Sequence, residues 1–128
     1  MFQKMLQGGS GGSEEVNIIS GEERVIGKLD GKTLYSKTIV RNGSLNSGGS
    51  TMFSHEISNL DSVVSIDGTA KSGNLYRPII FAYATTSSNS AWYSGCYING
   101  SNIVIESGSS YAIEVTQQII TLVYTKTS

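Results

Sequence analysis

Residues 23–41, ERVIGKLDGKTLYSKTIVR, contain two short runs of apolar and β-branched residues that meet at Asp30-Gly31. An Asp-Gly pair between two such runs suits the positive φ angles of a two-residue type I′ turn. The stretch therefore predicts a β-hairpin. A second pair, Asn99-Gly100, joins two similar runs and predicts another hairpin with the same turn type.

The rest of the chain repeats this pattern. From Ser20 onward, runs rich in β-branched and aromatic residues alternate with clusters of Gly, Asn, Asp and Ser. About eight short strands spaced in this way are typical of an all-β, antiparallel sandwich or barrel, here expected to be jelly-roll-like. Pro78 cannot donate to a ladder, so we expect it at a sheet edge or a strand start. The predicted strands are 23–29, 33–41, 51–57, 61–68, 76–85, 91–98, 102–107 and 111–126.

Composition excludes several functional classes. The 128 residues include 9 basic and 10 acidic side chains, one Cys, one Pro and one His. A net charge of −1 disfavours a nucleic-acid partner, because nucleic-acid binders normally carry a basic excess. One Cys cannot form an internal disulfide, and one Cys with one His provides no structural zinc site. We predict no metal and no cofactor.

The chain is expected to have three parts. Residues 1–7 form a short N-terminal peptide, the Gly/Ser-rich residues 8–19 form a flexible linker, and residues 20–128 form the β domain. The first seven residues are too short for the apolar core of a signal peptide, and no apolar run reaches membrane-spanning length. We therefore expect synthesis in the cytoplasm, no export signal and no membrane insertion.

The N-terminal peptide has an apolar pattern of its own. Phe2, Met5 and Leu6 recur at i, i+3 and i+4, so one helical turn would place them on one face. Such a face on a flexible linker is a candidate attachment site for a larger particle. The alternatives are an artificial tail and a frayed terminus with no role.

The sequence contains few residues that could form a catalytic site. His55 is the single imidazole, and no GxSxG motif is present to position a nucleophilic Ser near it. We expect His55 to be a strand residue that makes one hydrogen bond near the following loop. Cys96 lies in a strand-like run, where a small buried apolar residue is its expected role. We predict no catalytic residues.

The stronger functional signal is aromatic. Residues 76–100, YRPIIFAYATTSSNSAWYSGCYING, place Tyr and Trp beside Asn, Ser and Arg. Aromatic rings stack on the C–H faces of sugars, while neighbouring polar groups bind sugar hydroxyls. The candidate glycan or receptor surface consists of Arg77, Trp92, Tyr93 and Tyr97. In a sandwich many such rings fill the core instead, so the core remains the alternative for each of them.

Several phrases of the sequence resemble a known family. They are GEERVIGKLDGKTLYSKTIV at 21–40, HEISNLDSVVSIDGTA at 55–70, YRPIIFAYA at 76–84 and AIEVTQQIITLVYTKTS at 112–128. In order and spacing they are similar to the C-terminal β domain of tail, baseplate and fibre proteins of bacteriophages of Gram-positive gut bacteria. The first phrase lacks the Trp and Pro usual there, and the usual His-Gly pair is His55-Glu56.

The resemblance implies a β appendage module that forms a homotrimer on the virion and has no catalytic residues in the shared phrases. We expect a head or tail fibre or decoration protein that attaches to other virion proteins through residues 1–7. Its β domain would contact a glycan or protein on the host surface, and cell lysis would release it without a signal peptide. The alternative is a monomeric carbohydrate-binding module with Trp92 and Tyr93 as its platform.

Overall fold

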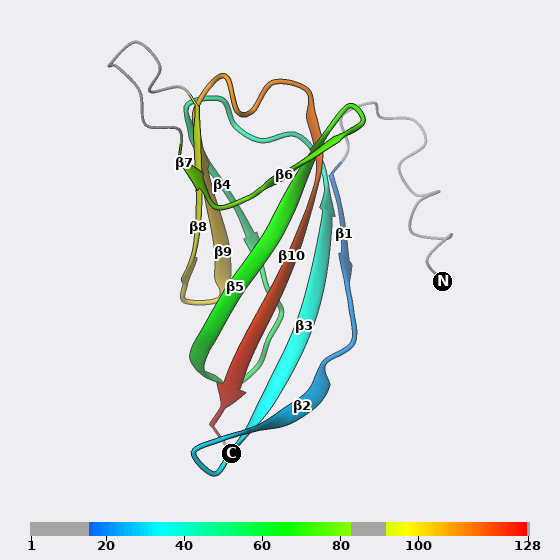
Figure 1. The fold of residues 1–128 in the computed structure, drawn as a ribbon. Coiled ribbons are helices and arrows are strands. Elements are labelled where there is room, and N and C mark those ends of the chain that lie inside the picture. Colours follow the sequence, from blue (N-terminus) through cyan, green and yellow to red (C-terminus); the bar gives the residue numbers. More distant parts are fainter. Residues whose placement is uncertain (1–15, 83–91, 128) are drawn as a thin grey trace.

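The computed structural model describes residues 16–82 and 92–127, and these residues form two antiparallel sheets without helices (Figure 1). The predicted attachment peptide 1–7 and the linker residues 8–15 lie outside the described residues. The strands are β1 (Asn17–Ser20), β2 (Arg24–Leu29), β3 (Lys32–Asn42), β4 (Gly49–Ser54), β5 (Leu60–Ser72), β6 (Leu75–Pro78), β7 (Phe81–Ala82), β8 (Tyr93–Asn99), β9 (Asn102–Ser107) and β10 (Val115–Lys126).

The two sheets are separate layers, so of the two predicted architectures the fold is a sandwich. The larger sheet has the order β1-β3-β10-β5-β6, and β2 pairs with β3 alongside β1. The smaller sheet has the order β4-β9-β8-β7 and faces the larger one (Figure 1). The prediction of an all-β antiparallel fold is confirmed.

The core lies between the sheets and follows the two-residue period of the strands. Ile120, Leu122 and Tyr124 of β10 are fully buried, and Ile103 and Ile105 of β9 meet them from the smaller sheet. In β10 the residues between them, Thr121 and Val123, are only half-buried, whereas in β9 the intervening Val104 is buried as well. The two-residue period directs the intervening residues of each strand to the outer faces, where Glu106 of β9 is exposed.

The outcomes for the two predicted hairpin turns differ. Asp30 and Gly31 have φ angles of 51° and 81°, so the first hairpin has the positive values that a type I′ turn requires. In the second hairpin Asn99 pairs with Asn102, so Gly100 and Ser101 are the central residues. Only Gly100 has a positive φ, which suits a type II′ turn; the predicted type I′ turn at Asn99-Gly100 is wrong.

The predicted linker is wrong at its C-terminal end. Residues 17–20 form β1, which pairs with residues 39–42 of β3, and Ile18 packs against the core. The short apolar segment that follows the Gly/Ser tract therefore belongs to the larger sheet. The β domain begins at Asn17 or earlier, and not at Ser20.

The predicted strand 76–85 is interrupted where the chain passes from one sheet to the other. β6 ends at Pro78 in the larger sheet, and β7 begins at Phe81 in the smaller sheet; residues 83–85 lie outside the described residues. Ile79, between the two strands, is fully buried. Pro78 lies on the edge strand β6, as predicted from its missing N–H.

Candidate functional site

The structure separates the four residues predicted to form a binding surface. Tyr93 and Tyr97 lie on the outer face of β8 and are 38% and 43% exposed. Trp92 is partly buried against the core, and the Arg77 guanidinium lies 5.3 Å from the centre of its ring. Arg77 also lies 5.2 Å from the Tyr111 ring. Trp92 and Arg77 thus contact each other and residues of the core, whereas Tyr93 and Tyr97 face solvent.

The two exposed tyrosines flank an open position on the sheet. Gly95 lies midway between them on the same face, directly opposite Glu106 of β9. A Cβ atom placed on Gly95 would meet no other heavy atom within 4 Å. Strands rise by about 3.3 Å per residue, so the Cα atoms of Tyr93 and Tyr97 are about 13 Å apart. The face is thus a shelf bounded by two rings.

Two apolar residues complete this face. Met52 on β4 is exposed to solvent, whereas Val104, which lies opposite both Met52 and Tyr97, is 1% exposed and supports the face from below. We call the set Met52, Tyr93, Gly95, Tyr97, Val104 and Glu106 the tyrosine platform. It belongs to three adjacent hydrogen-bonded strands, so its backbone is held by the ladders on which it lies.

The charge of the tyrosine platform comes from one carboxylate. Tyr97 Oη donates a hydrogen bond to Glu106 Oε2 over 3.2 Å. Local desolvation and the hydrogen bond to this carboxylate raise the pKa of Tyr97, so its phenol remains a protonated donor at neutral pH. The platform can accept hydrogen bonds at Glu106 and stack flat groups on its rings.

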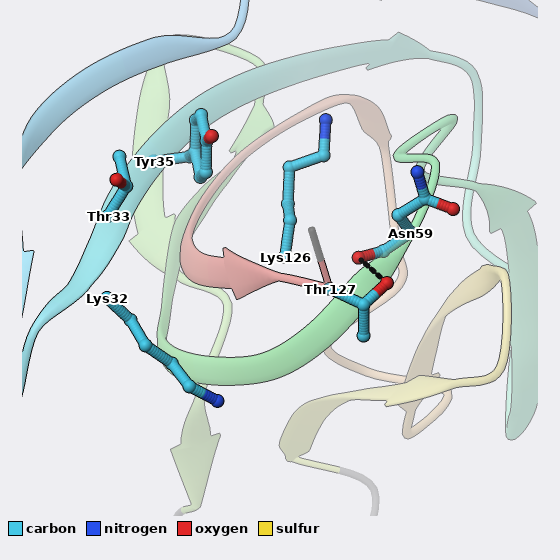
Figure 2. A pocket seen from close by; sticks show the side chains of 6 residues that line it. All are labelled: Lys32, Thr33, Tyr35, Asn59, Lys126 and Thr127. Atoms are coloured by element: carbon cyan, nitrogen blue, oxygen red, sulfur yellow. Dashed lines mark hydrogen bonds between the residues drawn. The ribbon is translucent and has the colours of Figure 1, made fainter.

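A second candidate site is a hollow on the larger sheet, near the hairpin β2–β3 and the end of β10. It has a volume of about 430 Å³. Figure 2 shows its lining side chains, which come from the start of β3, the end of β10 and the residue before β5. Three parts of the chain that are distant in sequence meet there: residues 32–35, Asn59 and residues 126–127. Its lining residues are Lys32, Thr33, Tyr35, Asn59, Lys126 and Thr127.

The polar groups around this hollow bind one another. Lys32 Nζ lies 2.8 Å from Asp61 Oδ2, and Lys126 Nζ lies 3.0 Å from Glu23 Oε1. Tyr124 Oη donates to Glu23 Oε2 over 2.6 Å. The hydrogen bond from Tyr124 lowers the pKa of Glu23, and the hydrogen bond from Lys32 lowers the pKa of Asp61.

These contacts join the ends of β3, β5 and β10 to the segment between β1 and β2. Both amines of the hollow have a carboxylate partner, so its positive charge is locally balanced. Thr127 Oγ1 also donates to the Asn59 carbonyl oxygen, a bond that Figure 2 shows. We interpret this end junction, formed by Glu23, Tyr35, Asp61, Tyr124 and Lys126, as a structural feature. The tyrosine platform is the stronger candidate site.

His55 and Cys96 both have structural surroundings. The His55 ring is 1% exposed; its Nε2 lies 2.9 Å from the Gly100 carbonyl oxygen, and its Nδ1 accepts a hydrogen bond from the Ile57 N–H. It therefore makes two hydrogen bonds, one more than predicted, just after β4. Cys96 packs against the core, and burial raises the pKa of its thiol to about 11. That thiol is protonated at neutral pH.

Comparison of the chain with models of protein families, with curated proteins and with solved structures gave no match. In the described residues, no three His, Cys, Asp or Glu side chains are grouped as metal ligands would be. Among residues 16–82 and 92–127, no helix has the length and hydropathy needed to cross a membrane. The fold and the site thus define the molecule as a β-sandwich with an exposed aromatic platform.

Proposed function

We propose that this chain is a structural appendage of a bacteriophage virion, a fibre or decoration protein on head or tail, whose β domain contacts the host cell surface. The observation that carries the proposal is the tyrosine platform, with two exposed rings on either side of the open position at Gly95. Rigid tyrosine rings provide contact area at low cost in conformational entropy. The phrases at 21–40, 55–70 and 112–128 support the virion context by their resemblance to phage appendage domains.

A glycan is the surface ligand that fits the platform best. The Cα atoms that carry its two rings are about 13 Å apart along β8, a spacing that suits an oligosaccharide with one sugar on each ring better than one compact apolar side chain. The outer face also presents Ser50, Ser54, Asn99 and Asn102 along the same strands, as their register shows. These hydroxyls and amides can exchange hydrogen bonds with sugar hydroxyls.

The test is the binding of the labelled protein to an array of immobilised bacterial surface polysaccharides. Tyr97→Ala and Tyr93→Ala should each weaken binding about tenfold, because each removes one of the two stacking rings of the platform. Tyr76→Ala on β6 is the matched control, since Tyr76 is also exposed but lies on the larger sheet. Absence of binding by the wild type, or equal losses in Tyr97→Ala and Tyr76→Ala, would contradict the proposal.

Self-association is part of the proposal and is supported by β2. All six residues of β2 are exposed, including Val25 at 67%, together with Ile26 and Leu29. Among the described strands, β2 pairs only with β3, so its other edge is free. An exposed, apolar strand edge is a site for pairing with another chain. We propose a homotrimer that covers this edge and attaches to other virion proteins through residues 1–7.

Light scattering of the full chain should give three times the mass of one chain. Val25→Asp should shift the protein toward the monomer, because a charge on this edge would be buried in the interface. Leu75→Asp is the matched control, since Leu75 is equally exposed on the far edge of the same sheet. A wild-type monomer would contradict the trimer; if that monomer binds polysaccharide, it is a carbohydrate-binding module instead.

A further inference from the structure

We infer that the tyrosine platform selects saccharides that carry a free amine, and that Glu106 is the group that recognises this amine. The inference rests on the proposed function, because it concerns the same face of the protein. It names the class of glycan that the face would bind. Three features support it: the position of Glu106, the charge of the surrounding face and the neighbouring ring.

Glu106 lies at the centre of the shelf. It stands directly opposite Gly95, and Tyr93 and Tyr97 are the residues on either side of Gly95 on this face. Side chains on directly opposite residues of a ladder are neighbours, and diagonal ones remain within reach of long side chains. A sugar ring resting over Gly95 therefore meets the Glu106 carboxylate at its edge.

Among residues 16–82 and 92–127, no basic group forms an ion pair with Glu106. The ion pairs of the described residues join Lys32 to Asp61 and Lys126 to Glu23, at the other end of the sandwich. One carboxylate oxygen of Glu106 accepts the hydrogen bond from Tyr97. That phenol is a neutral donor, so the negative charge of the carboxylate remains available to a ligand.

The other described residues on the outer face of β4, β8 and β9 carry no charge. The register places neutral residues around Glu106 on this side of β4, β8 and β9: Ser50, Met52, Ser54, Tyr93, Gly95, Tyr97, Asn99, Asn102 and Val104. The local potential is therefore negative, which disfavours phosphate and carboxylate groups on a glycan. An ammonium group is attracted instead by the carboxylate and by the π face of the neighbouring tyrosine.

The test compares two probes that differ only in the amine. Deacetylated chitosan oligosaccharide carries free amines, and the same oligosaccharide after N-acetylation does not. The wild-type protein should bind the amine form about tenfold more tightly at low salt, and added salt should reduce this preference. Glu106→Gln should abolish the preference, because the amide retains a hydrogen-bond acceptor but lacks the charge.

Glu22→Gln is the matched control, because it makes the same change in net charge at an exposed residue outside the platform. It should retain the preference, and both variants should keep the thermal unfolding midpoint of the wild type. The inference is overturned if Glu106→Gln keeps the preference, if the wild type prefers the N-acetylated form, or if it binds neither probe. If one of these results is obtained but the protein still binds surface polysaccharides in a way that depends on Tyr97, only the inference about the amine is wrong. If the protein does not bind surface polysaccharides either, the inference and the proposed function are both wrong.

Discussion

Tyr124→Ala is expected to lower the free energy of unfolding by about 3–5 kcal/mol, the range for removing a large buried aromatic side chain. Tyr124 is fully buried in β10, its ring is stacked on Tyr35 with centroids 5.8 Å apart, and its hydroxyl binds Glu23. The substitution leaves a cavity at the end junction and removes one partner of the Glu23 carboxylate. Urea unfolding followed by circular dichroism measures the change.

Tyr124→Phe separates the two contributions. It keeps the ring and removes only the hydrogen bond to a charged group, so a smaller loss of about 1.5–3 kcal/mol is expected. The pKa of Tyr124 is raised, first by burial and then by Glu23, so the hydroxyl is the donor in this bond at neutral pH. Equal losses in the two variants would contradict the packing role of the ring.

Trp92→Ala should have the second largest effect, a loss of about 2–3 kcal/mol, since this ring is only partly buried. The ring packs against the core and covers the Arg77 guanidinium, whose buried Nη1 has no hydrogen-bond partner among the described residues. Removal of the ring exposes apolar core atoms and takes away one face of the cation–π contact. Thermal and urea unfolding should both detect this loss.

Tyr93→Ala is the control for this prediction because Tyr93 is the adjacent residue and faces solvent. Its loss of stability should stay within about 0.5 kcal/mol, as for other surface substitutions. Polysaccharide binding should show the opposite order, with the larger loss in Tyr93→Ala. If Trp92→Ala leaves stability unchanged and abolishes binding, Trp92 belongs to the ligand surface and its assignment to the core is wrong.

The local features of the fold could be predicted because they depend on neighbouring residues. Asp30-Gly31 specifies its own turn, and the alternation in 120–124 identifies the buried face of β10. The boundary at Asn17 could not be predicted in the same way. The residues of β1 follow a Gly/Ser tract. They form a strand because they pair with residues 39–42, which are distant in sequence.

Of the predicted binding residues, the sequence identified Tyr93 and Tyr97 as surface residues but did not separate them from Trp92 and Arg77, whose positions depend on tertiary contacts. Trp92 precedes β8 and packs against the core, whereas Tyr93, the first residue of β8, faces solvent. The sequence pattern does not say which of the two faces the core. The role of Glu106 and the end junction depend on contacts between distant segments, such as Lys126 with Glu23, separated by 103 residues.

The most direct test of the central proposal is host adsorption by phage particles that carry variants of this protein. Wild-type, Tyr76→Ala and Tyr93→Ala/Tyr97→Ala particles should contain equal amounts of the protein, measured by mass spectrometry. The first two should adsorb to host cells at the same rate, and the double variant should adsorb at least about tenfold more slowly, because both rings of the platform are absent. Equal adsorption by all three, or absence of the protein from wild-type particles, would contradict a virion appendage that contacts the host through the tyrosine platform.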